Sequence, residues 1–287
     1  MRKISTTLPR NLESNMASNH NVLEPTVLYK YLSADRAVEV LPENGNGALR
    51  ATQPAALNDP LECATRCNAI YPSEDKEVHE MVEVLNWIVP EHSLENSDVQ
   101  FSRRQLGTQA WNELLRKQLS LRFGVVSFSS SALHPLLWAH YADSGAGVVI
   151  GYHVSVLKTI TTGYERLGAV QYSDEPLTNN GYVIFKNESN LHAILLTKAS
   201  YWDYEQEWRL TLELKNIVGT GKSDQNGHSI NICPIPNEAV TEVYFTERTP
   251  KSTVETIKAR LKNPSNRFRA EAPRKAILAP DKYGYEI

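Results

Sequence analysis

The chain has 287 residues, of which 41% are hydrophobic and 22% are charged, which is ordinary usage for a globular protein that buries a core. The 30 Lys and Arg residues against 33 Asp and Glu residues leave a formal charge of −3, which excludes a global positive field that would attract DNA or an anionic membrane. No apolar run is long enough for a secretory signal peptide or a membrane-spanning helix, and three cysteines are too few for a disulfide framework. We therefore expect a soluble, cytoplasmic protein.

The first part of the chain predicts a tail followed by one domain. Residues 1–24 are rich in Asn, Ser and Thr and contain few large apolar side chains, so we expect a mobile tail there and a single domain over residues 25–287. Cys63 and Cys67 lie four residues apart without a second pair of ligands, which makes a poor zinc site. We therefore expect no bound metal.

The elements at the start of the domain are a strand over residues 27–31, a short helix capped by Ser33, a second strand over 49–52 and a turn over 57–62. Two longer segments then repeat apolar residues at helical spacing. They predict a helical insertion, over about residues 74–121, that packs on the sheet. Its apolar residues are Val78, Met81, Val82, Leu85 and Ile88, then Leu106, Ala110, Leu114 and Leu115.

The rest of the chain continues to mix strands and helices. Residues 201–215 alternate between apolar and polar side chains with a period of two, which is typical of a half-buried strand, and residues 216–228 are expected to form a polar loop. Together the patterns predict an α+β fold with a bent or split mixed β-sheet core. The remaining predicted elements are strands at 123–129, 148–152, 170–172, 239–245 and 276–278, and helices from Pro135, at 189–199 and at 250–261.

Two serines in the predicted strand 123–129 share one face. Side chains alternate along a strand, so Ser127 and Ser129 point the same way. This pattern fits either an exposed hydroxyl face at a strand end or a pair of polar groups in a site.

The predicted short helix that begins at Pro135 is dense in aromatic side chains. Helical spacing places His134, Trp138 and Tyr141 on one face and points His140 elsewhere, so the two histidines do not form a metal site. Large aromatics with polar tips are found both in cores and in pockets that bind rings.

The segment from Tyr204 to Arg209 carries the densest charge pattern. If it is a strand, Glu205, Glu207 and Arg209 share one face while Trp208 points into the core. One interpretation is a solvated face with an ion pair of little energetic weight. The other is a site in which the carboxylates stabilise a cation-like transition state and the guanidinium orients them or grips an anionic ligand.

These motifs together resemble a bacterial family catalogued as domain of unknown function 2971. The resemblance runs from about residue 26 to 250, with the motifs in the expected order, and it implies no settled activity. The residues that carry it are Leu28 to Tyr31, Asn58 to Pro60, Val126 to Ser129, Trp138 to Asp143, Gly147 and Val148, Tyr172, Lys198, Trp202, Glu205, Glu207, Trp208 and Arg209.

The order of Lys30, the Ser127 and Ser129 pair, and the Glu205 and Glu207 pair is also similar to ADP-ribosyltransferases. That resemblance implies an α+β core bent around NAD as substrate, with Glu207 stabilising the oxocarbenium-like state, Ser127 orienting it, and Trp138 or Tyr141 stacking on nicotinamide. Tyr31, Ser129 and Arg209 would also contact NAD. Lys30 departs from the pattern, because that family has Arg or His there, and an amine lacks the guanidinium fork and the imidazole ring.

Two classes of function follow. One is an NAD-consuming transferase or hydrolase of the effector, toxin or phage-defence type, with an unknown acceptor that is protein or nucleic acid. The other is a non-catalytic module that binds a ligand or nucleic acid. A minor third interpretation is a metal-independent nuclease that uses His140 with Glu207. The single-site hypothesis predicts that Ser127, Trp138, His140 and Glu207 lie around one pocket.

Overall fold

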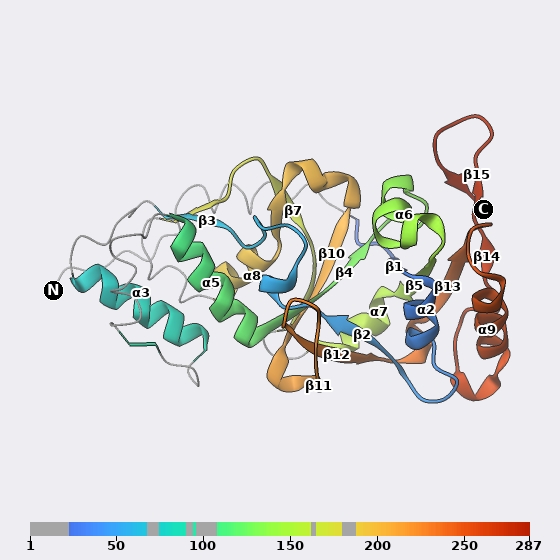
Figure 1. The fold of residues 1–287 in the computed structure, drawn as a ribbon, viewed down its shortest axis with the longest axis horizontal. Coiled ribbons are helices and arrows are strands. Elements are labelled where there is room, and N and C mark those ends of the chain that lie inside the picture. Colours follow the sequence, from blue (N-terminus) through green and yellow to red (C-terminus); the bar gives the residue numbers. More distant parts are fainter. Residues whose placement is uncertain (1–22, 68–74, 90–93, 96–107, 162–164, 180–187) are drawn as a thin grey trace.

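The computed structural model describes residues 23–67, 75–89, 94–95, 108–161, 165–179 and 188–287. All but the last two residues of the predicted tail, and residues 74, 90–93 and 96–107 of the predicted insertion, lie outside these ranges. The chain has the expected α+β fold, with a mixed sheet in its middle and helices at both ends (Figure 1).

A seven-stranded sheet forms the centre of the molecule. All neighbouring strands are antiparallel except β13 and β14, which pair in parallel, so the sheet is mixed as predicted. β1, β4 and β10 are direct neighbours in it, which brings together segments up to 180 residues apart in the chain. The order is β14 (Arg274–Lys275), β13 (Val240–Phe245), β5 (Val148–His153), β1 (Val27–Leu32), β4 (Phe123–Ser129), β10 (Glu207–Glu213) and β6 (Arg166–Ala169).

A second, three-stranded sheet consists of β11 (Val218–Ser223), β12 (Ser229–Ile235) and β2 (Gly47–Ala51). Its link to the main sheet is a pair of backbone hydrogen bonds of 2.8 Å between Thr52 and Val125. The prediction of a loop over residues 216–228 is therefore wrong for β11. Its side chains are mostly exposed and polar, so the strand is held by backbone pairing with β12 and leaves little hydrophobic pattern.

Three two-stranded ladders complete the strands: β3 (Thr65–Cys67) with β8 (Leu177–Asn179), β7 (Gln171–Ser173) with β9 (Thr197–Ala199), and β15 (Ile277–Leu278) with β16 (Tyr285–Glu286). The predicted helix over 189–199 ends earlier for this reason, because its last three residues form β9.

The helices gather in two groups. α3 (Asp75–Ile88), α5 (Thr108–Arg122) and α8 (Glu188–Leu195) lie towards one end, while α2 (Ala34–Val40), α7 (Val154–Leu157) and α9 (Lys251–Lys262) lie towards the other (Figure 1). α6 (Pro135–Tyr141) begins at the proline, as predicted, and Ser33 caps α2 by accepting a hydrogen bond from the backbone N–H of Arg36.

Strand β4 separates two hydrophobic cores. Phe123 and Val125 pack with residues of α3, α5 and α8, which confirms that the helical insertion packs on the sheet. Val126 and Phe128 point the other way and pack with Trp208 and the rest of the larger core. Trp208 is thus buried in the core, as the alternation predicted.

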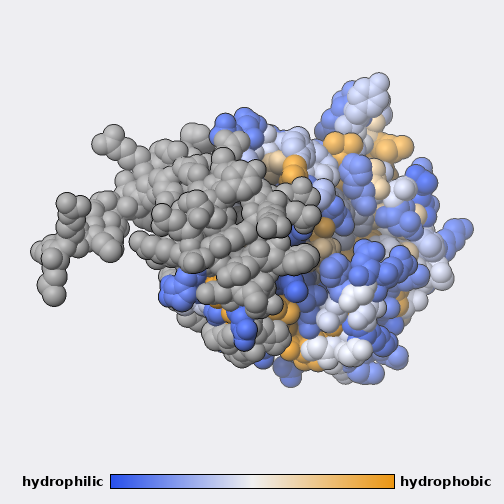
Figure 2. Space-filling view, turned by 60° about the vertical axis from the view of Figure 1, so that its left-hand side comes forward, coloured by the Kyte–Doolittle hydropathy of each residue, from blue (hydrophilic) through white to orange (hydrophobic). Residues whose placement is uncertain are grey.

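No described helix is long and apolar enough to cross a membrane. On the face shown in Figure 2, the described surface is mostly hydrophilic, and its hydrophobic residues are scattered in small patches.

Candidate functional site

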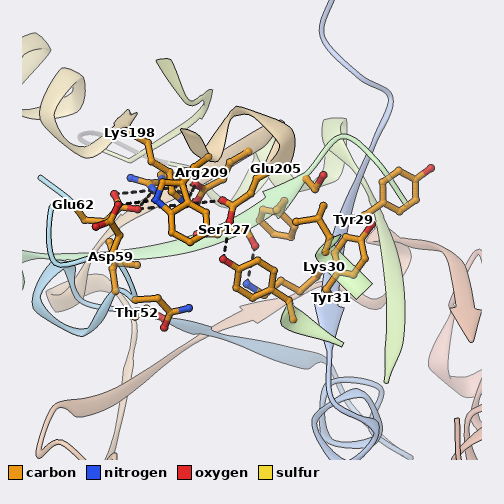
Figure 3. A pocket seen from close by; sticks show the side chains of 18 of the residues that line it. Tyr29, Lys30, Tyr31, Thr52, Asp59, Glu62, Ser127, Lys198, Glu205 and Arg209 are labelled. Carbon is orange, nitrogen blue, oxygen red and sulfur yellow. Dashed lines mark hydrogen bonds and ion pairs between the residues drawn. The ribbon is translucent and has the colours of Figure 1, made fainter. Parts of the chain in front are cut away.

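A cavity of about 200 Å³ opens above the strands β1, β4 and β10 (Figure 3). Its other walls come from the segment 52–62, from α6 and from the 3₁₀ turn η6 (Ser200–Glu205). Residues from five separate stretches of the chain, 29–31, 52–62, 127–129, 137–141 and 198–209, therefore meet here. Polar and aromatic side chains dominate the lining, among them Tyr29, Lys30, Tyr31, Asp59, Glu62, Ser127, Ser129, Tyr141, Lys198, Trp202, Glu205, Glu207 and Arg209.

Strand pairing sets the positions of the charged residues on β10. Glu207 lies opposite Ser129 and Arg209 lies opposite Ser127 in the antiparallel ladder. Paired residues in a ladder project to the same side of the sheet, so both serines and both charged residues face the cavity. β1 brings Lys30 from the other side of β4.

Arg209 is only 1% exposed, and its guanidinium joins two carboxylates. Nε donates to Glu207 Oε1 at 2.9 Å, and Nη2 lies 2.8 and 2.9 Å from the two carboxylate oxygens of Glu62 and 3.0 Å from Glu207 Oε2. Nη1 donates to the carbonyl oxygen of Leu195 at 2.7 Å. The buried charge is therefore fully hydrogen-bonded, which a buried guanidinium requires.

Lys198 is a second cation shared by the same group of carboxylates. Its Nζ lies 2.5 Å from Glu205, 3.0 Å from Glu207 and 3.5 Å from Glu62. Burial opposes the charge, but the three carboxylates outweigh it and raise the pKa of Lys198. Three carboxylates and two cations thus form one buried network, which we call the carboxylate cluster.

Glu207 stays ionised in this cluster. Burial alone would raise its pKa, but the charge and hydrogen bonds of Arg209, the charge of Lys198 and a hydrogen bond with the Ser127 side chain lower the pKa of Glu207 to about 2. The residue therefore presents a fixed negative charge beside the cavity at neutral pH.

Glu205 reaches the cluster from a turn instead of a strand. β10 begins at Glu207, and Gln206 has a left-handed backbone with φ of 44°, so the prediction that the strand includes Glu205 is wrong. Tyr141 donates to Glu205 Oε1 at 2.6 Å, and burial together with this carboxylate raises the pKa of the Tyr141 phenol. Both glutamates point towards Lys198 because of this turn, and not because they alternate along one strand.

The face that carries Glu205, Glu207 and Arg209 is buried, so it is not a solvated face with a weak surface ion pair. This face is buried because β10 is an inner strand of the sheet, and because α8 and the segment that contains Glu62 cover it.

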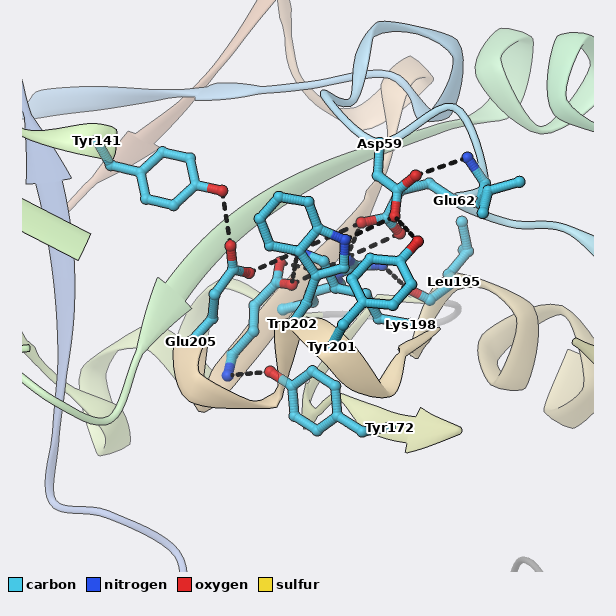
Figure 4. Close-up of polar contacts among 12 residues, drawn as sticks. Asp59, Glu62, Tyr141, Tyr172, Leu195, Lys198, Tyr201, Trp202 and Glu205 are labelled. Atoms are coloured by element: carbon cyan, nitrogen blue, oxygen red, sulfur yellow. Dashed lines mark hydrogen bonds and ion pairs between the residues drawn. The ribbon is translucent and has the colours of Figure 1, made fainter. Parts of the chain in front are cut away.

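A pair of aromatic residues covers the cluster. The Trp202 indole N–H donates to Asp59 Oδ2 at 2.8 Å, and the Tyr201 hydroxyl lies 3.3 Å from the same oxygen. Lys198 Nζ lies 4.9 Å from the centre of the Trp202 ring. Figure 4 shows these side chains from close by. The loop around Asp59 and the turn η6 are thereby joined across the carboxylates.

Lys30 is the remaining cation of the cavity. Its Nζ donates to the backbone carbonyl oxygen of Ser127 at 2.7 Å and lies 6.0 Å from the centre of the Phe128 ring. Burial lowers the pKa of Lys30 to about 8, although the Glu207 carboxylate opposes this shift.

The structure brings most of the predicted site residues together. Those that line the cavity are Lys30, Tyr31, Ser127, Ser129, Tyr141, Glu205, Glu207 and Arg209.

Trp138 and His140 do not line this cavity, so the prediction of one pocket around Ser127, Trp138, His140 and Glu207 is wrong for these two residues. α6 presents Leu137 and Tyr141, one helical turn apart, to the cavity. Trp138 therefore points into the core, where its indole N–H donates to Ala132 and its ring meets Tyr31 edge-on at 5.8 Å, while His140 is exposed.

Five of the polar and aromatic residues that line the cavity were not predicted as site residues from the sequence: Tyr29, Asp59, Glu62, Lys198 and Trp202. All of these except Glu62 belong to the motifs of the family resemblance, which was the available signal. Glu62 was only part of a predicted turn, and no local pattern shows that its carboxylate turns inward to meet Arg209.

Among the described residues, no group of three or more His, Cys, Asp or Glu side chains is arranged to hold a metal ion. The carboxylates that do converge, Glu62, Glu205 and Glu207, already have Lys198 and Arg209 as partners.

The model of the family described as protein of unknown function (DUF2971) matches residues 137–210. This match confirms the resemblance over a segment that includes Tyr141, Lys198, Glu205, Glu207 and Arg209, while Lys30, Glu62 and Ser127 lie outside it. No curated protein and no solved structure matches the chain.

Proposed function

From the order of the motifs along the chain and the geometry of the cavity, we propose that the chain is an NAD-consuming enzyme of the ADP-ribosyltransferase type, with Glu207 as its catalytic carboxylate. The observation that carries the proposal is the order β1, β4, β10 in one sheet, because three motifs that are distant in the sequence line one cavity through it. Lys30, Ser127 and Glu207 come from these strands in the order expected for such an enzyme.

The proposed reaction breaks the bond between the nicotinamide nitrogen and C1′ of its ribose. The electron pair of that bond passes to the nicotinamide ring, whose positive charge is neutralised, and positive charge develops on the ribose. The ionised Glu207 would stabilise this charge, because a fixed carboxylate needs no reorganisation as the charge appears. An acceptor nucleophile then forms a new bond to C1′ and releases its proton.

The surrounding residues would take supporting roles. Ser127 would orient Glu207, Tyr141 would offer its ring to nicotinamide, and Glu205 would act on the acceptor. A cavity of about 200 Å³ suits the nicotinamide and ribose end of NAD, so the rest of the dinucleotide would extend through the open side. Consumption of NAD would also suit an effector, a toxin or a component of phage defence in a bacterial cell.

Release of nicotinamide from NAD tests the proposal. We expect Glu207→Gln to keep the shape of the side chain and to lower the rate roughly 10²–10³-fold, as for other single electrostatic contributors. Glu205→Gln should lower the rate of nicotinamide release less than Glu207→Gln does.

Glu213→Gln is the matched control, because Glu213 is also buried on β10 but pairs with Arg122 away from the cavity. Equal rates in the wild type and in Glu207→Gln would contradict the assignment of Glu207.

A second candidate is a non-catalytic module that binds a small polar ligand. It is favoured by the engagement of the carboxylates, since Glu205 and Glu207 already accept hydrogen bonds from Lys198, Arg209 and Tyr141. Thermal stabilisation by NAD without release of nicotinamide would support this reading. The nuclease reading has no such support, because His140 does not line the cavity that holds Glu207.

A further inference from the structure

Two lysines line the same cavity in opposite electrostatic settings. Lys198 Nζ has three carboxylates within 3.5 Å. Lys30 Nζ donates to one neutral carbonyl oxygen, that of Ser127, and within the described part of the chain it has no ion pair with a carboxylate. The amine of Lys30, on a partly buried side chain, therefore has a neutral hydrogen-bond partner instead of a counter-charge.

Uncharged groups lie closest to the amine of Lys30. The Phe128 ring lies beside it and Tyr31 and Tyr141 line the cavity with it. Among the charged groups, Glu207 on β10 favours the protonated form and Arg36 on α2 opposes it, while burial dominates and sets the pKa of Lys30 near 8. Lysines in such settings act as nucleophiles, because an unprotonated amine keeps a free electron pair.

We propose that Lys30 is a reactive amine that captures small aldehydes or ketones in this cavity as a Schiff base. The electron pair of Nζ attacks the carbonyl carbon, the carbonyl π electrons pass to oxygen, and that oxygen takes up a proton. The resulting carbinolamine loses water as the C=N bond forms, so no oxidant or reductant is consumed. This activity goes beyond the proposed function, because it requires neither NAD nor Glu207.

Trapping of the Schiff base tests the inference on the unaltered chain. The protein is incubated near neutral pH with acetaldehyde and sodium cyanoborohydride, which reduces the C=N bond to a stable amine, and the modified lysines are mapped by mass spectrometry. Lys30 should be alkylated at least about tenfold faster than an exposed lysine such as Lys222. Lys198, in the same cavity, should remain unmodified.

A titration adds a second readout. Alkylation of Lys30 should rise to half its maximum near pH 8, while alkylation of exposed lysines should still be rising well above that pH. Lys30→Arg keeps a cation and should abolish the cavity adduct, and circular dichroism checks that this variant is folded. Modification of Lys30 at the same rate as exposed lysines, or of Lys198 instead of Lys30, would overturn the inference whether or not the chain cleaves NAD.

Discussion

Arg209 is the residue on which the carboxylate cluster most depends. It contacts Glu62 and Glu207 on one side and the carbonyl oxygen of Leu195 on the other. Removal of one partner of a buried ion pair leaves the other charge without compensation, which costs more than the pair contributes when it is intact.

Arg209→Met should therefore lower the free energy of unfolding by about 3–5 kcal/mol, because two buried carboxylates lose their main partner. Urea denaturation at neutral pH measures this loss. Lys215→Met is the control, since Lys215 pairs with Glu213 but its side chain is 66% exposed, and we expect a change of at most about 1 kcal/mol. Similar small losses in both variants would show that the cluster does not hold the fold together.

Lys30 gives a prediction about pH. The pKa of Lys30 is about 8 in the folded chain, against an ordinary value of 10.5. Between these two pH values the unfolded chain binds more protons at this amine than the folded chain does. The contribution of Lys30 to the free energy of unfolding therefore rises with pH in that range. Below pH 8 the amine is charged in both states and its burial costs stability. Lys30→Met should therefore be stabilised relative to the wild type near pH 7, and this difference should shrink as the pH rises towards 10.5.

Urea denaturation of both proteins at several pH values measures the difference, in which the titration of the tyrosines largely cancels. Lys222→Met, at an exposed position, is the control for the loss of a lysine from the surface. A difference between Lys30→Met and the wild type that stays constant from pH 7 to 10 would contradict the burial of this amine.

At the scale of elements, close packing around the start of β5 depends on a glycine. A Cβ atom on Gly147 would lie 2.1 Å from the carbonyl oxygen of Leu32 and 2.8 Å from backbone atoms of Ala142. Backbone atoms of a strand and a turn cannot move aside as a flexible side chain can. The residue thus allows the turn after α6 to approach β1.

Gly147→Ala should lower the free energy of unfolding by at least about 1–3 kcal/mol, the usual cost of overpacking. Thermal or urea denaturation checks this. Gly284→Ala is the matched control, because a Cβ atom there would meet nothing within 4 Å, and its effect should stay within about 0.5 kcal/mol. A neutral Gly147→Ala variant would mean that this turn and β1 do not approach each other closely.

At the scale of the whole molecule, two of the three hydrophobic cores of the described residues share one strand. Phe123 and Val125 of β4 belong to the core with α3, α5 and α8, and Val126 and Phe128 belong to the larger core. Loss of β4 would open both cores at once. We therefore expect the described residues to unfold as a single cooperative unit.

Urea unfolding followed by far-ultraviolet circular dichroism, which reports secondary structure, and by tryptophan fluorescence should give coincident curves. Amide hydrogen exchange of Leu119 in one core and of Ile150 in the other should also report similar free energies of opening. Two separated transitions would instead indicate that the helical block around α3 and α5 folds independently.

Much of this protein could be predicted from sequence alone, because the signals are local. Side-chain alternation predicted the inward position of Trp208 and the shared face of Ser127 and Ser129, and Pro135 predicted the start of α6. The order of Lys30, Ser127 and Glu207 along the chain predicted residues that do share a cavity. These features depend on neighbours within a few residues, or on motifs that a family keeps in order.

Other features were decided only by tertiary structure. Glu62 enters the site because Arg209, 147 residues later, is buried beside it, and burial of a charge depends on partners that no local pattern reveals. Trp138 and His140 lie outside the site because α6 turns Leu137 and Tyr141 towards the cavity instead. Helical periodicity defines which residues share a face, but packing against the sheet selects the face that turns towards the cavity.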